Sequence, residues 1–257
     1  MYVSSTRFQN NFGKYLELCR KDNVIITKNG KKKAVLLGYP RDYEGYEAGE
    51  PIPDYGTSPR KKNLVTYQEF LKLTEESDQR YELIDGVVYL MASPSFTHQR
   101  ILGQLHLLYN EFFKDYESCD PFLSPLDIDL LRQPILRERE FTEDDINVVQ
   151  PDLVVLCDPE KDLDEKDKYK GTPKLAIEII SPSSRSKDRV KKLDLYMESG
   201  IGEFWIIDPE SRTVMINFFK DYELESAGTF GVENTARSSL YPGLSVEVEQ
   251  LFGKSSS

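Results

Sequence analysis

Two short apolar runs, PDLVVLC at residues 151–157 and KLAIEII at residues 174–180, decide the fold of this chain. Nearly continuous runs of aliphatic residues are typical of strands in the middle of a sheet that is covered on both faces. Each run carries one carboxylate, Asp152 in the first and Glu178 in the second. A carboxylate inside an apolar strand costs free energy unless a partner compensates it, so these two side chains predict a site.

A helix predicted from about residue 186 to 198 follows the second run. It carries Asp188, Lys192 and Tyr196 at four-residue spacing, and residues four apart share one helical face. Two strand carboxylates beside a helix lysine indicate a site for Mg²⁺ or Mn²⁺, since hard cations prefer oxygen ligands. A metal site of this kind suggests phosphodiester hydrolysis. We expect Asp152 and Glu178 to bind the metal, and Lys192 to assist the attacking water and to stabilise the transition state of that reaction.

Simpler interpretations of these residues stay open. Asp152 could be a capped strand end and Glu178 a buried ion-pair partner, because structural ion pairs produce similar patterns. Asp188 is expected to orient Lys192, and Tyr196 to pack beneath it. The chain has only two histidines, which argues against a zinc site of the His/Cys type. We expect His98 at the surface or at a helix cap, with a substrate contact open, and His106 on a helix surface.

Helices and strands mix along the chain without strict alternation, which predicts an α/β fold with a mixed sheet. Thr66 and Glu69 form a capping-box pattern ahead of a helix at 67–76, and Asp85-Gly86 marks a hairpin turn. A long helix is expected over 95–116, with further strands at 127–131, 203–208 and 213–219.

Charge divides the chain unevenly. The net charge is −11, but residues 1–41 hold nine Lys and Arg against Glu17 and Asp22, so this segment carries +7 and the rest −18. Such asymmetry indicates a nucleic-acid contact in the basic part. No stretch is apolar enough to cross a membrane or to act as a signal peptide. The three cysteines, Cys19, Cys119 and Cys157, are far apart, which predicts reduced thiols and a cytoplasmic protein.

The segments YELIDGVVYLM, Pro94–His98, VVQPDLVVL, AIEIISPSSRSKDRVKKLDLY and GIGEFWIIDP resemble the Uma2 (DUF820) family of the PD-(D/E)XK nuclease superfamily. The resemblance covers residues 64–252 and implies a restriction-endonuclease-like mixed central sheet flanked by helices. It assigns Asp152 and Glu178 to the acidic positions of the superfamily. Glu82 falls in the first acidic motif, where it completes the site or binds a second metal. Ile180 stands where the superfamily has a lysine, and the family pattern implies that Lys192 replaces it, with Lys191 as the alternative.

The segment STRFQNNFGKYLELCRKDNVIITKNGKKKAVLLGY at residues 5–39 resembles the N-terminal domain of Phd/YefM-type antitoxins. That resemblance implies a helix followed by a hairpin over residues 1–40, forming a homodimer that binds DNA, with Arg7 and Asn10 as candidate contacts. Residues 41–63, rich in Pro and Gly, are interpreted as a linker, and 253–257 as a disordered tail. In the second domain, Arg185, Lys187 and Arg189 are either a phosphate track or a solvated helix face.

Three functional hypotheses follow. The leading one is a Mg²⁺-dependent endonuclease that hydrolyses DNA, with Glu82, Asp152, Glu178 and Lys192 in the site. The alternative is a non-enzymatic DNA-binding regulator that carries a degenerate nuclease fold. A third and weaker hypothesis is the antitoxin partner of a small toxin.

Overall fold

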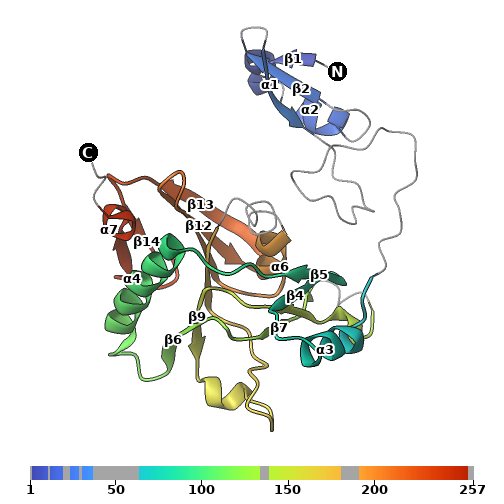
Figure 1. Ribbon diagram of the computed structural model, residues 1–257. Helices are drawn as coiled ribbons and strands as arrows, with labels where there is room; N and C mark the ends of the chain where they lie inside the picture. Colours follow the sequence, from blue (N-terminus) through green and yellow to red (C-terminus); the bar gives the residue numbers. More distant parts are fainter. Residues whose placement is uncertain are drawn as a thin grey trace. The chain divides into compact units, whose positions relative to one another are not determined.

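The structure is a computed structural model that describes residues 2–10, 12–19, 24–28, 31–36, 64–133, 139–180 and 191–253. The chain divides into two compact units, Met1–Lys62 and Asn63–Ser257, shown in Figure 1. The predicted linker at 41–63 and all of the tail except Gly253 lie outside the described residues.

The first unit is a three-stranded sheet with two helices. Its elements are β1 (Tyr2–Ser4), α1 (Ser5–Asn10), α2 (Phe12–Cys19), β2 (Val24–Lys28) and β3 (Lys31–Leu36). β1 pairs parallel to β2, and β2 pairs antiparallel to β3. Val3 and Tyr15 form its small core, with Phe8 packed against them. The sequence analysis predicted a helix and a hairpin here but missed β1, because a strand this short shows no alternation to detect.

A six-stranded sheet forms the centre of the second unit. Its order is β13-β12-β11-β10-β9-β6, made of β6 (Cys119–Leu123), β9 (Leu153–Cys157), β10 (Leu175–Ile179), β11 (Glu203–Asp208), β12 (Thr213–Lys220) and β13 (Glu223–Phe230). β10 and β11 are parallel and the other neighbours are antiparallel. The predicted mixed sheet is therefore confirmed, and the two apolar runs of the sequence are its interior strands β9 and β10.

A second, antiparallel sheet has the order β5-β4-β8-β7. It contains β4 (Tyr81–Ile84), β5 (Val87–Leu90), β7 (Ile128–Leu130) and β8 (Asn147–Val149). One face is covered by α3 (Tyr67–Glu75), where Phe70 packs on Leu83. From the other face Ile84 joins a core cluster with Val154 and Ala176 of the large sheet, so the two sheets share a core.

Helices cover both faces of the large sheet (Figure 1). On one face lie α4 (Phe96–Phe113) and α7 (Val248–Phe252), together with the strand pair β14 (Thr235–Arg237) and β15 (Ser245–Glu247). On the other lie α6 (Lys192–Glu198) and the second sheet. Leu175 and Ile177 of β10 pack toward α4, whereas Ala176 packs toward α6, so Glu178 projects to the α6 side. None of the described helices is long and apolar enough to cross a bilayer.

Local signals set where these elements begin. The Thr66–Glu69 capping box is formed at the start of α3, and Ser95 caps α4 through its hydroxyl. The β4–β5 turn places Asp85 at φ 50° and Gly86 at φ 73°, the left-handed conformation that a two-residue hairpin turn requires. The predicted capping box and hairpin turn are therefore confirmed.

The cysteines differ from the expectation. Cys119 and Cys157 form a disulfide, so these two side chains are not reduced thiols. They are 38 residues apart in the chain, yet they lie directly opposite each other on β6 and β9. Their separation in sequence concealed this pairing, because β-ladder register brings together residues that no local pattern connects.

Candidate active site

Asp152 and Glu178 meet at one end of the β9–β10 ladder. Leu153 is opposite Ile177 in this antiparallel pair, so the preceding residue, Asp152, stands opposite Glu178. Residues opposite one another point to the same face of a sheet. Asp152 Oδ2 accepts a hydrogen bond from the backbone N–H of Ile179 at 2.7 Å. Both carboxylates are buried, with 9% and 5% of their surface exposed.

Lys192 joins this pair from α6, of which it is the first residue. Its Nζ lies 2.6 Å from Glu178 Oε1 and 2.7 Å from Glu82 Oε1, and the residue is only 1% exposed. An ammonium group is held in a protein interior only when anions compensate it. Ile180 points into the apolar core instead. The structure thus brings Lys192 to the carboxylates.

Glu82 is held from the second sheet. It is fully buried on β4, and its Oε1 also accepts the backbone N–H of Gln150 at 3.1 Å. The Gln150 side chain accepts from Arg80 Nε and donates to Asp127 Oδ1, both at 2.7 Å. Sequence analysis did not single out Gln150, which lies in the segment that crosses from β8 to β9 and ends in Asp152.

Tyr196 lies one helical turn after Lys192. Its hydroxyl donates to Glu178 Oε1 at 2.7 Å, and the side chain is fully buried. Burial, followed by the charge of Glu178, raises the pKa of Tyr196 well above its ordinary value. The hydroxyl therefore stays protonated and donates to Glu178 Oε1, the oxygen that also contacts the ammonium of Lys192.

His98 was expected at the surface or at a helix cap, and the structure corrects this. It stands in the first turn of α4, and its Nε2 lies 3.0 Å from Asp152 Oδ2. Its side chain is only 16% exposed. The signal that could have found it is weak: a histidine three residues after a helix-capping serine, one of two histidines in the chain.

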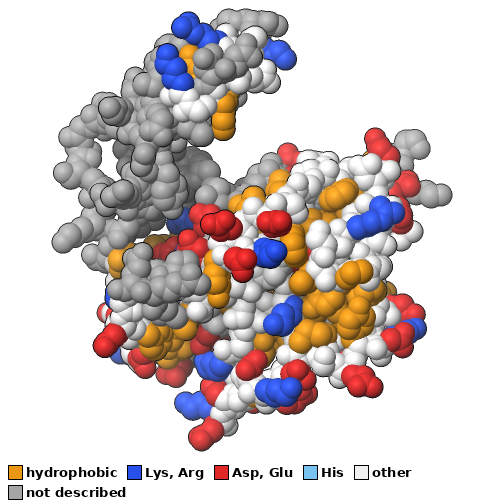
Figure 2. All heavy atoms as spheres, turned by 180° about the vertical axis from the view of Figure 1, so that it is seen from behind, with side chains coloured by type: hydrophobic (Ala, Val, Ile, Leu, Met, Phe, Trp, Pro, Cys, Tyr) orange, Lys and Arg blue, Asp and Glu red, His pale blue; other side chains and the backbone are white. Residues whose placement is uncertain are grey.

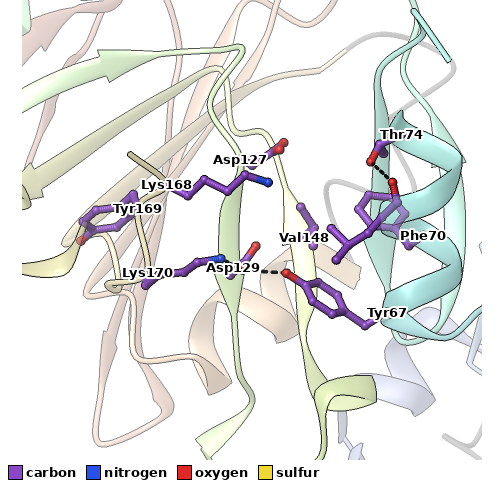
Figure 3. Close-up of a pocket in the computed structure, with 10 residues that line it drawn as sticks. Tyr67, Phe70, Thr74, Asp127, Asp129, Val148, Lys168, Tyr169 and Lys170 are labelled. Carbon is purple, nitrogen blue, oxygen red and sulfur yellow. Dashed lines mark hydrogen bonds and ion pairs between the residues drawn. The ribbon is translucent and has the colours of Figure 1, made fainter. Parts of the chain in front are cut away.

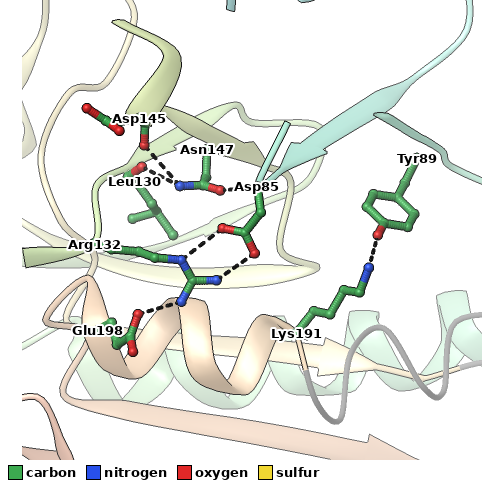
Figure 4. A network of polar contacts seen from close by, with 8 residues as sticks. All are labelled: Asp85, Tyr89, Leu130, Arg132, Asp145, Asn147, Lys191 and Glu198. Atoms are coloured by element: carbon green, nitrogen blue, oxygen red, sulfur yellow. Dashed lines mark hydrogen bonds and ion pairs between the residues drawn. The ribbon is translucent and has the colours of Figure 1, made fainter. Parts of the chain in front are cut away.

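Figure 4 shows a polar network that connects the elements carrying Glu82 and Lys192. Arg132 donates from Nε and Nη2 to the two oxygens of Asp85 at 2.9 Å each, and from Nη1 to Glu198 Oε2 at 2.6 Å. Asp85 is in the β4–β5 turn and Glu198 ends α6. Lys191 contacts the hydroxyl of Tyr89 and lies 5.0 Å from its ring centroid.

Most of the remaining predicted residues cannot be placed relative to this cluster. Asp188, Arg185, Lys187 and Arg189 lie outside the described residues, as does the side chain of Asn10. Arg7 is exposed on α1, and its backbone N–H donates to Ser4 Oγ at 3.3 Å. Figure 2 shows basic side chains over the first unit, whereas acidic and basic side chains intermingle over the second.

A small cavity of about 30 Å³ lies between α3 and β7 (Figure 3). Tyr67, Asp129 and Lys170 are among its lining residues, and Tyr67 donates to Asp129 Oδ2 at 3.1 Å. This volume is enough for about one water molecule. The cavity therefore offers no room for a substrate, and the buried carboxylate–lysine cluster is the better candidate site.

Comparison with known sequences identifies the family of the second unit. The sequence model of the Uma2 family, described as "Putative restriction endonuclease", matches residues 67–249, which is most of the chain. The chain belongs to the Uma2 family. All the contacts among Glu82, His98, Asp152, Glu178 and Lys192 lie within the Uma2 region.

Two relatives of this Uma2 chain are informative. An uncharacterized protein of Synechocystis is 29% identical over 153 residues, which is 59% of this chain and 72% of the relative. The second is a crystal structure from Anabaena variabilis, described as that of a putative nuclease belonging to DUF820. The match covers 73% of this chain and 97% of the Anabaena chain. Its TM-score is 0.56 at 23% identity, so it shows that the fold is shared.

The model of the Phd/YefM antitoxin family of type II toxin–antitoxin systems matches residues 1–52. The resemblance of the N-terminal segment is therefore confirmed. In this chain that segment precedes the Uma2 region.

The Uma2 cluster fits a divalent cation held by few protein ligands. Among the described residues, no group of three or more His, Cys, Asp or Glu side chains is placed to hold a metal ion. Mg²⁺, however, is commonly bound through one or two carboxylates and several waters. Glu82, Asp152 and Glu178 with Lys192 carry a formal charge of −2 in a buried place, and such an excess favours a cation. Asp152 Oδ1 has no hydrogen-bond partner in the described part of the chain.

Proposed function

We propose that this protein is a divalent-metal-dependent endonuclease that hydrolyses phosphodiester bonds of DNA. The observation that carries the proposal is the buried ammonium of Lys192, held between Glu178 and Glu82 beside Asp152. Acidic groups with one cationic side chain are the combination that phosphodiester hydrolysis uses. The description of the Uma2 family supports the same activity.

Each residue has a distinct role in this proposal. Asp152 and Glu178 would hold Mg²⁺ or Mn²⁺, and the bound ion would polarise the phosphate and acidify a water. Lys192 places its positive charge next to the reacting phosphate and orients the attacking water. Tyr196 donates to Glu178 and keeps that carboxylate in place. Glu82 holds the ammonium from the opposite side.

The test is cleavage of plasmid DNA by the purified full-length chain with Mg²⁺, with Mn²⁺ and with a chelator. We expect cleavage only with metal, and a loss of at least about 100-fold in Asp152→Ala and Glu178→Ala, because each removes a metal ligand. Asp120→Asn is the matched control, since Asp120 is an exposed carboxylate on β6 and should leave the rate unchanged. Cleavage that persists in both ligand variants would point to a contaminating nuclease and end the proposal.

A second candidate function is a DNA-binding regulator in which the first unit does the work. The match of residues 1–52 to Phd/YefM antitoxins favours it, as do the exposed basic residues Arg7, Lys14 and Lys28. In this reading the first unit forms a homodimer that contacts DNA phosphates, and Arg7→Ala weakens binding to all sequences alike. Calorimetric titration with Mn²⁺ separates the two functions: binding that Asp152→Ala abolishes supports the nuclease, and no binding supports the regulator.

The antitoxin hypothesis has a separate readout. A small toxin that copurifies with the full-length chain from its native cells would support it, whereas the chain purifying alone would count against it.

A further inference from the structure

His98 reaches the candidate site from a helix on the opposite face of the large sheet from Lys192. It is held at the start of α4, where Ser95 Oγ accepts the backbone N–H of His98 at 3.2 Å. The side chain then extends to Asp152, with Nε2 at 3.0 Å from Oδ2. Because a carboxylate only accepts, this contact is attractive when Nε2 carries a proton. The imidazole therefore contacts one oxygen of one carboxylate.

That oxygen is already occupied on another side. Asp152 Oδ2 accepts the backbone N–H of Ile179 at 2.7 Å, so a backbone N–H and the imidazole Nε2, from two different elements, converge on it. Two contacts restrict the rotation of the carboxylate plane more than a single one would. The other oxygen, Oδ1, has no hydrogen-bond partner among the described residues. The arrangement thus leaves Oδ1 available to a ligand that the described residues do not supply.

The second ring nitrogen of His98 provides an independent argument. Nδ1 is buried and has no hydrogen-bond partner in the described part of the chain. Burying an imidazole with one nitrogen unpartnered costs free energy, because that nitrogen loses its hydration and gains no hydrogen bond in return. An apolar side chain would pack in this position without that cost. The ring is therefore better explained by what Nε2 does for Asp152 than by packing.

We propose that His98 is a positioning residue for the metal site, whose Nε2–H turns Asp152 so that Oδ1 faces the bound cation. This inference rests on the proposed metal-dependent function. It gives His98 no contact with the substrate or with the ion. Its effect is on affinity, since hydrogen bonds that orient a ligating carboxylate typically change metal affinity 10- to 100-fold.

Two amide substitutions test the inference, because each mimics a different ring nitrogen. The side-chain nitrogen of Gln can occupy the place of Nε2, whereas that of Asn is shorter and corresponds to Nδ1. We expect His98→Asn to weaken Mn²⁺ binding by about 10- to 100-fold in calorimetry without DNA, and His98→Gln to stay within about threefold of the unsubstituted protein. The Mn²⁺ concentration for half-maximal cleavage should shift by the same factors.

His106→Asn is the matched control, since His106 lies on the same helix and makes no contact with Asp152 that the structure records. It should leave Mn²⁺ affinity unchanged. Thermal unfolding of each variant identifies loss of folding, which would lower affinity in His98→Gln and His98→Asn alike. If His98 had a purely structural role, Mn²⁺ affinity would fall in both variants, and His98→Gln and His98→Asn would not differ.

The possible outcomes distinguish failure of this inference from failure of the proposed nuclease function. If the unsubstituted protein binds Mn²⁺ and His98→Asn binds it equally well, His98 does not position the ligand and this inference alone is overturned. Equal weakening in both amide variants overturns it as well. If the unsubstituted protein neither binds Mn²⁺ nor cleaves DNA, the proposed function fails and the inference falls with it.

Discussion

The Nζ of Lys192 lies 2.6 Å from Glu178 Oε1, although the two residues are separated by 14 positions in the chain. The same ammonium lies 2.7 Å from Glu82 Oε1. One helix lysine therefore connects carboxylates from two different sheets. The stability of the unit and the chemistry of the site depend on the same contact.

Removing this ammonium should destabilise the fold as well as abolish activity. Lys192→Met leaves Glu82 and Glu178 buried without their cation, which typically costs about 3–5 kcal/mol. Urea unfolding should show this decrease in the free energy of unfolding. Lys191→Met is the neighbouring control and should cost less than Lys192→Met, because the recorded contact of Lys191 is with the hydroxyl of Tyr89. A Lys192→Met protein as stable as its parent would contradict the description of the cluster.

Loss of the hydroxyl should change the free energy of unfolding differently at two fully buried tyrosines. The Tyr196 hydroxyl donates to Glu178, so Tyr196→Phe should lower the free energy of unfolding by about 1–3 kcal/mol. The Tyr109 hydroxyl is buried without a partner among the described residues, so Tyr109→Phe should be neutral or stabilising. Chemical denaturation of both variants measures the difference, and equal losses would show that the Glu178 contact contributes nothing.

Stability should fall in alkaline solution because of the same buried rings. Burial raises the pKa of Tyr196 well above 10 and that of Tyr241 to about 12. Above pH 10 the unfolded chain loses phenolic protons that the folded chain retains, so ionisation favours unfolding. Each such tyrosine removes about 1.4 kcal/mol per pH unit until its folded pKa is reached. The decline, followed by denaturation at several pH values, should be shallower in Tyr196→Phe; an unchanged slope would mean that Tyr196 titrates normally.

Arg132 should be needed to keep the β4–β5 turn and α6 together. Its guanidinium is largely buried and makes three hydrogen bonds to Asp85 and Glu198. Arg132→Met should lower the free energy of unfolding by about 2–3 kcal/mol. Arg132→Lys should lower it by less, because lysine keeps the positive charge but lacks the planar set of N–H donors of the guanidinium. Cleavage rates should fall in the same order. If the lysine variant were the weaker of the two, charge and geometry would not explain the role of Arg132.

Counting free thiols tests for the disulfide between Cys119 and Cys157. With Cys119 and Cys157 joined, the chain denatured without reductant should show one reactive thiol, from Cys19, and three after reduction. Replacing both bonded cysteines by serine should lower the free energy of unfolding by about 2–4 kcal/mol, since the bond closes a loop of this length. Three thiols before reduction would show that the bond does not form in solution.

Much of the second unit could be read from local patterns. The Thr66–Glu69 box, the Asp85-Gly86 turn and the apolar runs of β9 and β10 depend on residues close together in the chain, and each is confirmed. The strand β1 was missed because it is too short to carry a pattern. The identity of the family could be recognised because its motifs are contiguous segments, and the match over residues 67–249 confirms it.

The sequence by itself determined the residue types of the site: carboxylates within apolar strands predict a compensating cation, whatever the fold. Only the tertiary structure decided which cation reaches which carboxylate. It placed Lys192 between Glu82 and Glu178, brought His98 to Asp152 and paired Cys119 with Cys157. The physical reason is that sheet register and helix packing set these distances. Both are collective properties of the whole core and leave no signal in the few residues that finally touch.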